Sequence, residues 1–328
     1  MTTDTVLRVD NLSKVFGSDE NRVVAVDEIS FALRRSETLS VVGESGCGKS
    51  TLGRAIVRGI EASDGSVTYR DDAGTDVDFL ALKGRELKRR RKDLQMIFQD
   101  PFSSLDPRMT VFDIIAEPLR ASMKISKGVL AERVAAIAKR VGLDPSHLRR
   151  YPHSFSGGQR QRIGIARALI TEPKVIVADE AVSALDVSIQ AQIINLLKDL
   201  QDELGISYLF IAHDLSVVNY ISDRVAVMYL GRIVELAETD DLFERPRHPY
   251  TEVLLSAVPQ PDPDLVNERI VPLGEVPSPT DRPSGCHFST RCRFATEKCR
   301  TDAPPLTEIE PGRFVACHLA NELQLQGV

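Results

Sequence analysis

The chain has 328 residues, of which 42% are hydrophobic and 27% charged, with a formal net charge of −6. This is the composition of a globular protein with room for one large domain and a smaller one, and its negative charge gives no electrostatic support for nucleic-acid binding. The opening MTTDTVLRVD lacks the basic and apolar regions of a signal peptide, and no stretch approaches the ~20 apolar residues of a membrane-spanning helix. We therefore expect a cytosolic protein, which could still dock on a membrane protein.

Strands and helices alternate along most of the chain. Apolar and polar residues alternate over roughly the first 40 positions, which predicts an antiparallel sheet. Further on, apolar runs predict buried strands, and helical spacing predicts a long helix that ends at Gly205. The strands are expected at 38–43, 174–180 and 207–214, the long helix at 188–204, and a mostly helical segment at about 100–165. The sequence thus predicts an α/β fold.

A basic run, KGRELKRRRK, occupies residues 83–92. Acidic residues flank it on both sides, which favours an exposed helix face over a nucleic-acid contact.

The composition changes after about residue 245, where prolines become frequent and four of the five cysteines follow. We expect a domain boundary near 250, with one domain at 1–250 and a smaller one at 251–328. A reducing cytosol disfavours disulfides, so the cysteines are interpreted as ligands of one metal centre, either tetrahedral zinc or an iron–sulfur cluster. Reduced cysteines without a ligand are the remaining alternative. The four are Cys286, Cys292, Cys299 and Cys317.

GESGCGKS at 43–50 matches the pattern of a phosphate-binding loop, with an apolar strand before it and a helix after it. Its glycines let successive N–H groups turn inward, and the helix start adds a positive dipole end. Lys49 can reach the β- and γ-phosphates, and the Ser50 hydroxyl can ligate Mg²⁺. A later apolar strand delivers Asp179, which is suited to hold Mg²⁺ through water, and then Glu180, which is suited to act as a general base.

Further motifs follow in a fixed order: FQD at 98–100, SFSGGQRQR at 154–162, SALD at 183–186 and IAHD at 211–214. Together with the phosphate loop, this set resembles the ATP-binding subunit of ABC transporters over residues 6–245. The resemblance implies a P-loop NTPase cassette with a RecA-like core, an antiparallel β subdomain and a helical signature subdomain. The cysteine-containing tail is then a small C-terminal extension.

The resemblance also implies the residues of the ATP site. Glu180, His213 and Gln99 are expected to be catalytic, and Mg²⁺ is expected at Ser50, Gln99 and Asp179. Phe16 is expected to stack on adenine, although a strand residue in the core is an alternative interpretation. The expected ATP contacts are Phe16, Gly43, Glu44, Ser45, Gly46, Cys47, Gly48, Lys49, Ser50, Thr51, Gln99 and Asp179.

In this family the signature loop closes over the ATP of a second chain, so two ATP sites need two ATP-binding subunits, identical or paralogous. Asp186 is expected to lie in the loop that contacts the partner. The signature loop corresponds to Ser156, Gly157, Gly158 and Gln159.

The stretches RHPYTEVLLSAVP and PSGCHFSTRC narrow the resemblance to importers of oligopeptides and dipeptides. That branch implies two transmembrane permease subunits, an indirect partnership with an extracytoplasmic solute-binding protein, no nucleic acid, and a place at the cytoplasmic face of the membrane. It also implies a four-iron–four-sulfur cluster at the tail cysteines. Nickel, glutathione or an oligosaccharide as the solute, or an ABC ATPase that works without a membrane transporter, are the alternatives. Ala181 departs from the family pattern, which usually has proline there and so a stiffer turn after Glu180.

Overall fold

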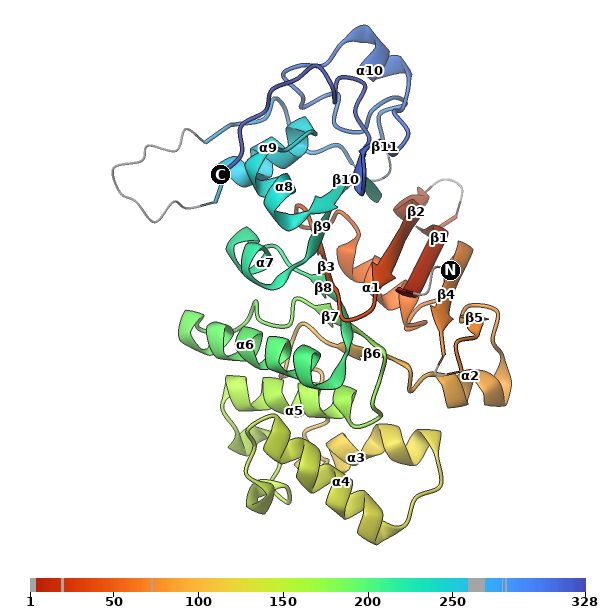
Figure 1. Ribbon diagram of the computed structural model, residues 1–328, viewed down its shortest axis with the longest axis vertical. Helices are drawn as coiled ribbons and strands as arrows, with labels where there is room; N and C mark the ends of the chain where they lie inside the picture. The colour runs from red at the N-terminus through yellow and green to blue at the C-terminus, as the bar shows by residue number, and fades with distance from the viewer. Residues whose placement is uncertain (1–3, 19–20, 72, 259–268, 279, 281) are drawn as a thin grey trace.

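Two β-sheets and a set of helices make up the structure (Figure 1), a computed structural model that describes residues 4–18, 21–71, 73–258, 269–278, 280 and 282–328. The larger sheet has eight strands in the order β11-β12-β10-β9-β3-β8-β7-β6, and the smaller has four in the order β2-β1-β4-β5. The strands are β1 (Thr5–Phe16), β2 (Val23–Arg34), β3 (Thr38–Val42), β4 (Asp64–Arg70), β5 (Asp76–Asp78), β6 (Leu94–Ile97), β7 (Val175–Asp179), β8 (Ser207–Ile211), β9 (Arg224–Tyr229), β10 (Arg232–Glu238), β11 (Thr307–Glu310) and β12 (Arg313–Val315).

The α-helices lie on both faces of the larger sheet and at its two ends. None of those in the described ranges is long and apolar enough to cross a membrane. They are α1 (Lys49–Ile56), α2 (Gly84–Arg90), α3 (Val111–Ser122), α4 (Lys127–Arg140), α5 (Gly157–Leu169), α6 (Val187–Leu204), α7 (Leu215–Ile221), α8 (Thr239–Glu244), α9 (Pro249–Ser256) and α10 (Glu297–Thr301).

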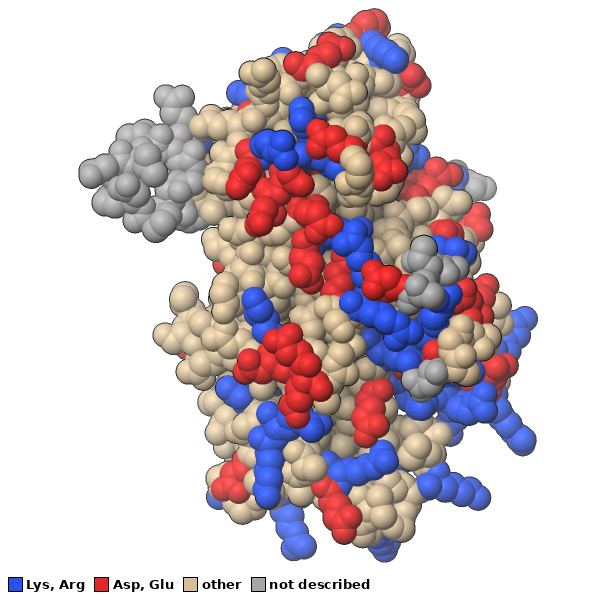
Figure 2. Space-filling view, viewed as in Figure 1, with Lys and Arg blue, Asp and Glu red and all other residues tan. Residues whose placement is uncertain are grey.

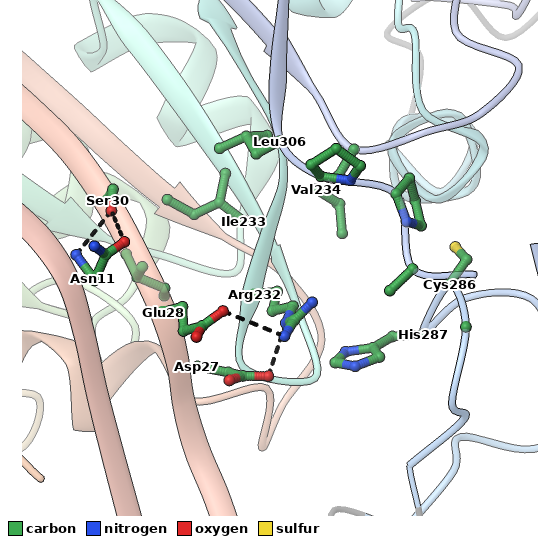
Figure 3. A pocket seen from close by; sticks show the side chains of 16 residues that line it. Asn11, Asp27, Glu28, Ser30, Arg232, Ile233, Val234, Cys286, His287 and Leu306 are labelled. Atoms are coloured by element: carbon green, nitrogen blue, oxygen red, sulfur yellow. Dashed lines mark hydrogen bonds and ion pairs between the residues drawn. The ribbon is translucent and has the colours of Figure 1, made fainter. Parts of the chain in front are cut away.

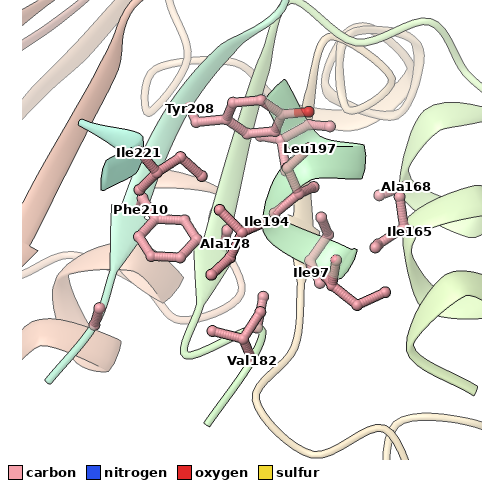
Figure 4. Packing of buried hydrophobic residues seen from close by; sticks show 14 of the residues in the cluster. Ile97, Ile165, Ala168, Ala178, Val182, Ile194, Leu197, Tyr208, Phe210 and Ile221 are labelled. Atoms are coloured by element: carbon pink, nitrogen blue, oxygen red, sulfur yellow. The ribbon is translucent and has the colours of Figure 1, made fainter. Parts of the chain in front are cut away.

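The central strands β3, β7 and β8 are parallel and buried along their whole length. Successive side chains of a strand point to opposite faces, so a strand covered on both sides is apolar throughout. On one face, Leu209 packs with α1 and the smaller sheet. On the other, Tyr208 and Phe210 pack with α6 and α7 (Figure 4). The predicted buried strands and the antiparallel sheet at the start of the chain are confirmed.

The basic run forms α2, in which no residue is buried. The expectation of an exposed helix face is therefore confirmed. Figure 2 shows basic and acidic side chains interspersed over the visible face, with basic ones gathered towards the lower right, where α2 lies.

The cysteine-rich tail continues the larger sheet. Strand β12 pairs antiparallel with β10, and β11 pairs with β12. At this junction the guanidinium of Arg313 donates to Glu235 at 3.2 Å, and both side chains are buried. Phe288 of the tail joins the main hydrophobic core. The tail therefore shares the core of the first 250 residues, which explains how a short proline-rich segment can be ordered.

A cavity of about 220 Å³ lies where the tail meets the smaller sheet (Figure 3). The charged residues that line it pair with one another, because Asp27 accepts from Arg232 at 2.7 Å and Glu28 lies 3.7 Å from the same guanidinium.

Candidate functional site: a nucleotide-binding centre

The phosphate loop joins β3 to α1, as the sequence predicts. Gly48 precedes the helix with φ of 107°, and a Cβ there would lie 2.0 Å from the carbonyl oxygen of Ala25. Only glycine fits this combination of a left-handed backbone and a close neighbour. The loop can therefore turn its N–H groups and the positive end of α1 towards a bound anion.

Three polar side chains meet beneath the loop. The Lys49 ammonium donates to the carbonyl oxygens of Gly43 (2.8 Å) and Glu44 (3.0 Å), and the Ser50 hydroxyl donates to Asp179 Oδ1 (2.7 Å). Asp179 is fully buried, its Oδ2 has no hydrogen-bond partner, and burial raises the pKa of its carboxyl group. An unpaired buried carboxylate oxygen beside a hydroxyl is a donor set that suits Mg²⁺.

Gln99, Glu180 and His213 converge next to this group although they come from distant parts of the sequence. Gln99 Nε2 donates to Glu180 Oε2 at 2.7 Å, and His213 Nδ1 lies 3.4 Å from the same oxygen. The His213 side chain is 57% exposed, whereas that of Glu180 is 16% exposed. Glu180 is thus the shared centre of the three.

The turn that carries Glu180 has an unusual backbone, with φ of 46°. Such angles are uncommon in residues other than glycine and are often found at functional sites. The Glu180 N–H donates to the carbonyl of Ile211, and the Glu180 carbonyl accepts from both the N–H and the hydroxyl of Ser183. Hydrogen bonds therefore close this turn around a buried Ala181.

Phe16 ends β1 and is 43% exposed, with the Lys14 ammonium 4.9 Å from its ring centroid. The alternative of a core residue is wrong, because the Phe16 side chain is exposed. Stacking on adenine stays a prediction.

The signature residues start α5. Ser156 caps the helix by accepting from the Gln159 N–H (3.4 Å), and Gln159 Oε1 accepts from the Ser156 N–H (3.0 Å). Gly158 lies so close to α6 that a Cβ would be 2.6 Å from the Ile189 side chain. The exposed Asp186 precedes α6 and so lies beside this helix start. Figure 1 shows α5, the helix that the signature residues start, lying apart from α1.

Comparison with known proteins bears directly on these motifs. Residues 26–183 match the family model described as ABC transporter, and residues 234–299 match the one described as oligopeptide/dipeptide transporter, C-terminal region. The Bacillus subtilis protein YkfD, whose name assigns it to oligopeptide transport, is 54% identical over 96% of this chain and 95% of its own length. The oligopeptide transport ATP-binding protein OppF of Haemophilus influenzae is 51% identical over 94% of this chain and 93% of its own. The chain belongs to the ABC transporter ATPase family.

Solved ABC cassettes have the same fold as this ABC ATPase. One, a dimeric cassette in a post-hydrolysis state with ADP and phosphate, is 27% identical and covers 71% of this chain and 98% of its own, with a TM-score of 0.63. A second, from Clostridium perfringens, is part of the cbiONQ transporter complex; it is 28% identical with a TM-score of 0.62 and covers 73% of this chain and 91% of its own. The predicted fold class is therefore confirmed.

The tail of this ABC ATPase touches the phosphate loop, which sequence reasoning missed. Arg291 makes two hydrogen bonds to the Glu44 carboxylate, and the Tyr250 hydroxyl accepts from the Glu44 N–H at 2.8 Å. The sequence places the cysteines far from Lys49, but Arg291 directly precedes Cys292. No local pattern marks either contact, because the partners are more than 200 positions apart.

The four tail cysteines line one small cavity of about 20 Å³, together with Phe288 and Leu319. All four are free thiols, so no disulfide joins them. Burial, with a smaller contribution from the neighbouring thiols, raises the pKa of Cys286 to about 11 and that of Cys317 to about 12. Within the described residues, no group of three or more histidine, cysteine or acidic side chains is placed to hold a metal ion. The metal centre therefore remains a prediction.

Proposed function

We propose that this ABC ATPase powers the import of peptides through a membrane transporter. The support is the match of residues 234–299 to the C-terminal region of oligopeptide/dipeptide transporters and the names of relatives similar over nearly the full chain. Nickel, glutathione or an oligosaccharide is the alternative solute for the same role. The boundary near residue 250 remains our proposed division between the cassette and its extension.

The observation that carries the proposed chemistry is the meeting of Gln99, Glu180 and His213 beside the Ser50–Asp179 pair. Ser50, Gln99 and Asp179 would hold Mg²⁺, which would neutralise phosphate charge. Lys49 and the loop N–H groups bind the β- and γ-phosphates, while Phe16 stacks on adenine.

Glu180 acts as the general base. Its carboxylate accepts a proton from the attacking water, and His213 holds the γ-phosphate and orients that water. Gln99 donates to Glu180 and senses the γ-phosphate, so it can transmit the state of the site to a permease subunit.

The signature residues and Asp186 act on the site of a second ATP-binding subunit, either a copy of this chain or a paralogue. The exposure of Ser156, Gln159 and Asp186 supports this assignment, because these side chains remain accessible to another chain. Two transmembrane permease subunits would hold the pair at the cytoplasmic face of the membrane and receive solute from an extracytoplasmic binding protein.

Cys286, Cys292, Cys299 and Cys317 would together hold a four-iron–four-sulfur cluster that stabilises the fold of the tail. Four thiols around one cavity support this choice. Structural zinc sites typically use ligand pairs two to four residues apart, whereas these cysteines are spaced more widely along the chain, which favours the cluster over zinc. Anaerobic purification should give brown protein with about four irons per chain. Colourless protein with one zinc per chain would overturn the proposal of a cluster but keep the four cysteines as ligands. Metal-free protein with an ordered tail would overturn both the cluster and the metal centre.

Replacement of the general base tests the proposed chemistry. Glu180→Gln should lower steady-state ATP hydrolysis by about 10²–10⁴-fold because the amide cannot accept the proton, while ATP still binds at the Lys49 loop. The variant should accumulate as an ATP-bound dimer in size-exclusion chromatography. Glu203→Gln on the exposed face of α6 is the matched control and should turn over ATP normally. Turnover of Glu180→Gln at the wild-type rate would refute the assignment.

Peptide import is tested separately from the chemistry. Co-purification of the chain with its permease subunits, followed by a binding screen on the associated solute-binding protein, should identify a peptide as the solute. Binding of nickel, glutathione or an oligosaccharide instead would overturn the peptide assignment and leave the ATPase assignment intact.

A further inference from the structure

A buried arginine of the tail reaches the phosphate loop. The Arg291 side chain is 7% exposed, and its Nη1 and Nη2 donate to Glu44 Oε2 (2.8 Å) and Oε1 (3.1 Å). This is the bidentate pairing of a guanidinium with a carboxylate, which fixes geometry as well as adding energy. Glu44 follows the first glycine of the phosphate loop directly, so the pair acts on the loop itself.

Aromatic side chains hold this arginine in place. The ring centroids of Tyr229, Tyr250 and Phe288 lie 4.6–5.3 Å from one another, and the Arg291 guanidinium carbon is 6.0 Å from the Tyr229 centroid and 5.9 Å from that of Phe288. The Arg291 N–H also donates to the Phe288 carbonyl at 3.0 Å. With its stem packed and its backbone tied, the guanidinium loses little freedom when it binds Glu44.

Glu44 is thus fixed twice, through its side chain by Arg291 and through its N–H by the Tyr250 hydroxyl. The next residues, Ser45 and Gly46, are exposed. A loop that binds phosphate through its backbone gains affinity when it is already in the bound shape, because binding then costs less ordering.

We propose that Arg291 is a positioning residue for ATP binding: by holding Glu44, it keeps the phosphate loop in the shape that accepts ATP. The C-terminal extension is then part of what sets nucleotide affinity. This inference rests on the proposed ATP site and goes beyond it, because it adds a residue outside the cassette motifs.

Equilibrium titration with a fluorescent ATP analogue and Mg²⁺ tests the proposal on the full chain. Arg291→Ala should weaken ATP binding about tenfold. This loss is smaller than the full cost of breaking a buried hydrogen-bonded charge pair, because only part of that cost is transmitted to ATP binding. Arg291→Lys should weaken it less, because an ammonium keeps the charge but cannot form the bidentate pair. Arg293→Ala is the matched control. It lies two residues away and pairs with Glu252 at 3.0 Å instead of with the phosphate loop, so it should change ATP affinity by less than about twofold.

Kinetics separates positioning from general damage to the fold. Arg291→Ala should raise KM for ATP about tenfold and leave kcat within about twofold, because saturating ATP restores the loop shape. In a double-mutant cycle, Glu44→Gln and Arg291→Ala should be strongly non-additive. Wild-type affinity in Arg291→Ala, or equal weakening by Arg293→Ala, would overturn the inference. Failure of the wild-type chain to bind ATP would instead overturn the proposed function.

Discussion

The phosphate loop and the signature end of α5 are both helix starts that suit a phosphate, yet the molecule treats them differently. The loop is held from behind by Arg291 and Tyr250, and its Lys49 side chain is buried. Ser156 and Gln159 are exposed and bond to each other. Under the proposed function, this difference means that the phosphate-loop half of each ATP site is completed within the chain, whereas the signature half is supplied by a second chain.

The largest expected effect comes from blocking the exposed signature end of α5. Ser156→Arg places a long side chain at the start of α5, which should prevent closure over a partner's ATP. Hydrolysis should fall about 10³-fold, as for loss of a group that stabilises transition-state charge. ATP affinity measured by titration should stay at the wild-type value, because the Lys49 loop is unchanged. Equal losses of affinity and turnover would break the distinction between the halves.

Weakening the junction that attaches the tail to the larger sheet should have the next largest effect. Arg313→Ala removes the partner of the buried Glu235 at the junction of β12 and β10, and should lower the free energy of unfolding by about 3 kcal/mol. Arg245→Ala is the control, because its pair with Asp241 is exposed and should cost less than about 1 kcal/mol. Urea unfolding without nucleotide measures both. Equal costs would mean that this junction does not stabilise the tail.

Adding a methyl group to a glycine of the phosphate loop should lower the free energy of unfolding by a smaller amount. Gly48→Ala combines a left-handed backbone with a close approach to Ala25, so we expect a loss of about 2 kcal/mol in unfolding free energy without nucleotide. Gly46→Ala has φ of 79° but open space around its Cβ, and should cost about 1 kcal/mol. The difference between the two variants isolates the steric contact. A Gly46 variant as unstable as the Gly48 variant would show that backbone strain accounts for the whole effect.

The smallest effect on the free energy of unfolding is expected from a substitution at the exposed start of α6. Val187 is 83% exposed at the start of α6, so Val187→Ser should change the unfolding free energy by less than about 0.5 kcal/mol. In the Glu180→Gln background the same change should weaken the ATP-bound dimer a few-fold, since an apolar contact with the partner would be lost. Analytical ultracentrifugation measures this. A marked loss of monomer stability would mean that Val187 packs within its own chain.

The fold was predictable where the signal is local. Short apolar runs such as those of β3, β7 and β8 are buried on both faces, and glycines such as Gly205 end helices in the left-handed conformation. Periodicity cannot tell which distant segments pair, so the addition of β11 and β12 to the larger sheet was not foreseen. Strand β12 takes its position by pairing with β10, and β11 by pairing with β12, and no pattern within the tail encodes this order.

The candidate site was predictable to a similar degree. Motif order identified Lys49, Asp179, Glu180 and His213, and the structure brings the last two within 3.4 Å of each other. The left-handed backbone of Glu180 could not be predicted, because nothing in its residue type favours that angle. Arg291 was missed for a different reason: its role depends on a pairing across 247 positions, and only the folded chain brings the partners together.

The pairing of β12 with β10 has a consequence for how the chain can be shortened. A chain that stopped after α9 would leave β10 as an open edge strand, because Val315 and Phe314 of β12 would no longer pair with Glu235 and Leu236. Unprotected edges of that kind pair with other chains, so such a fragment should aggregate during expression. The extension therefore also protects the edge of the larger sheet from pairing with another chain.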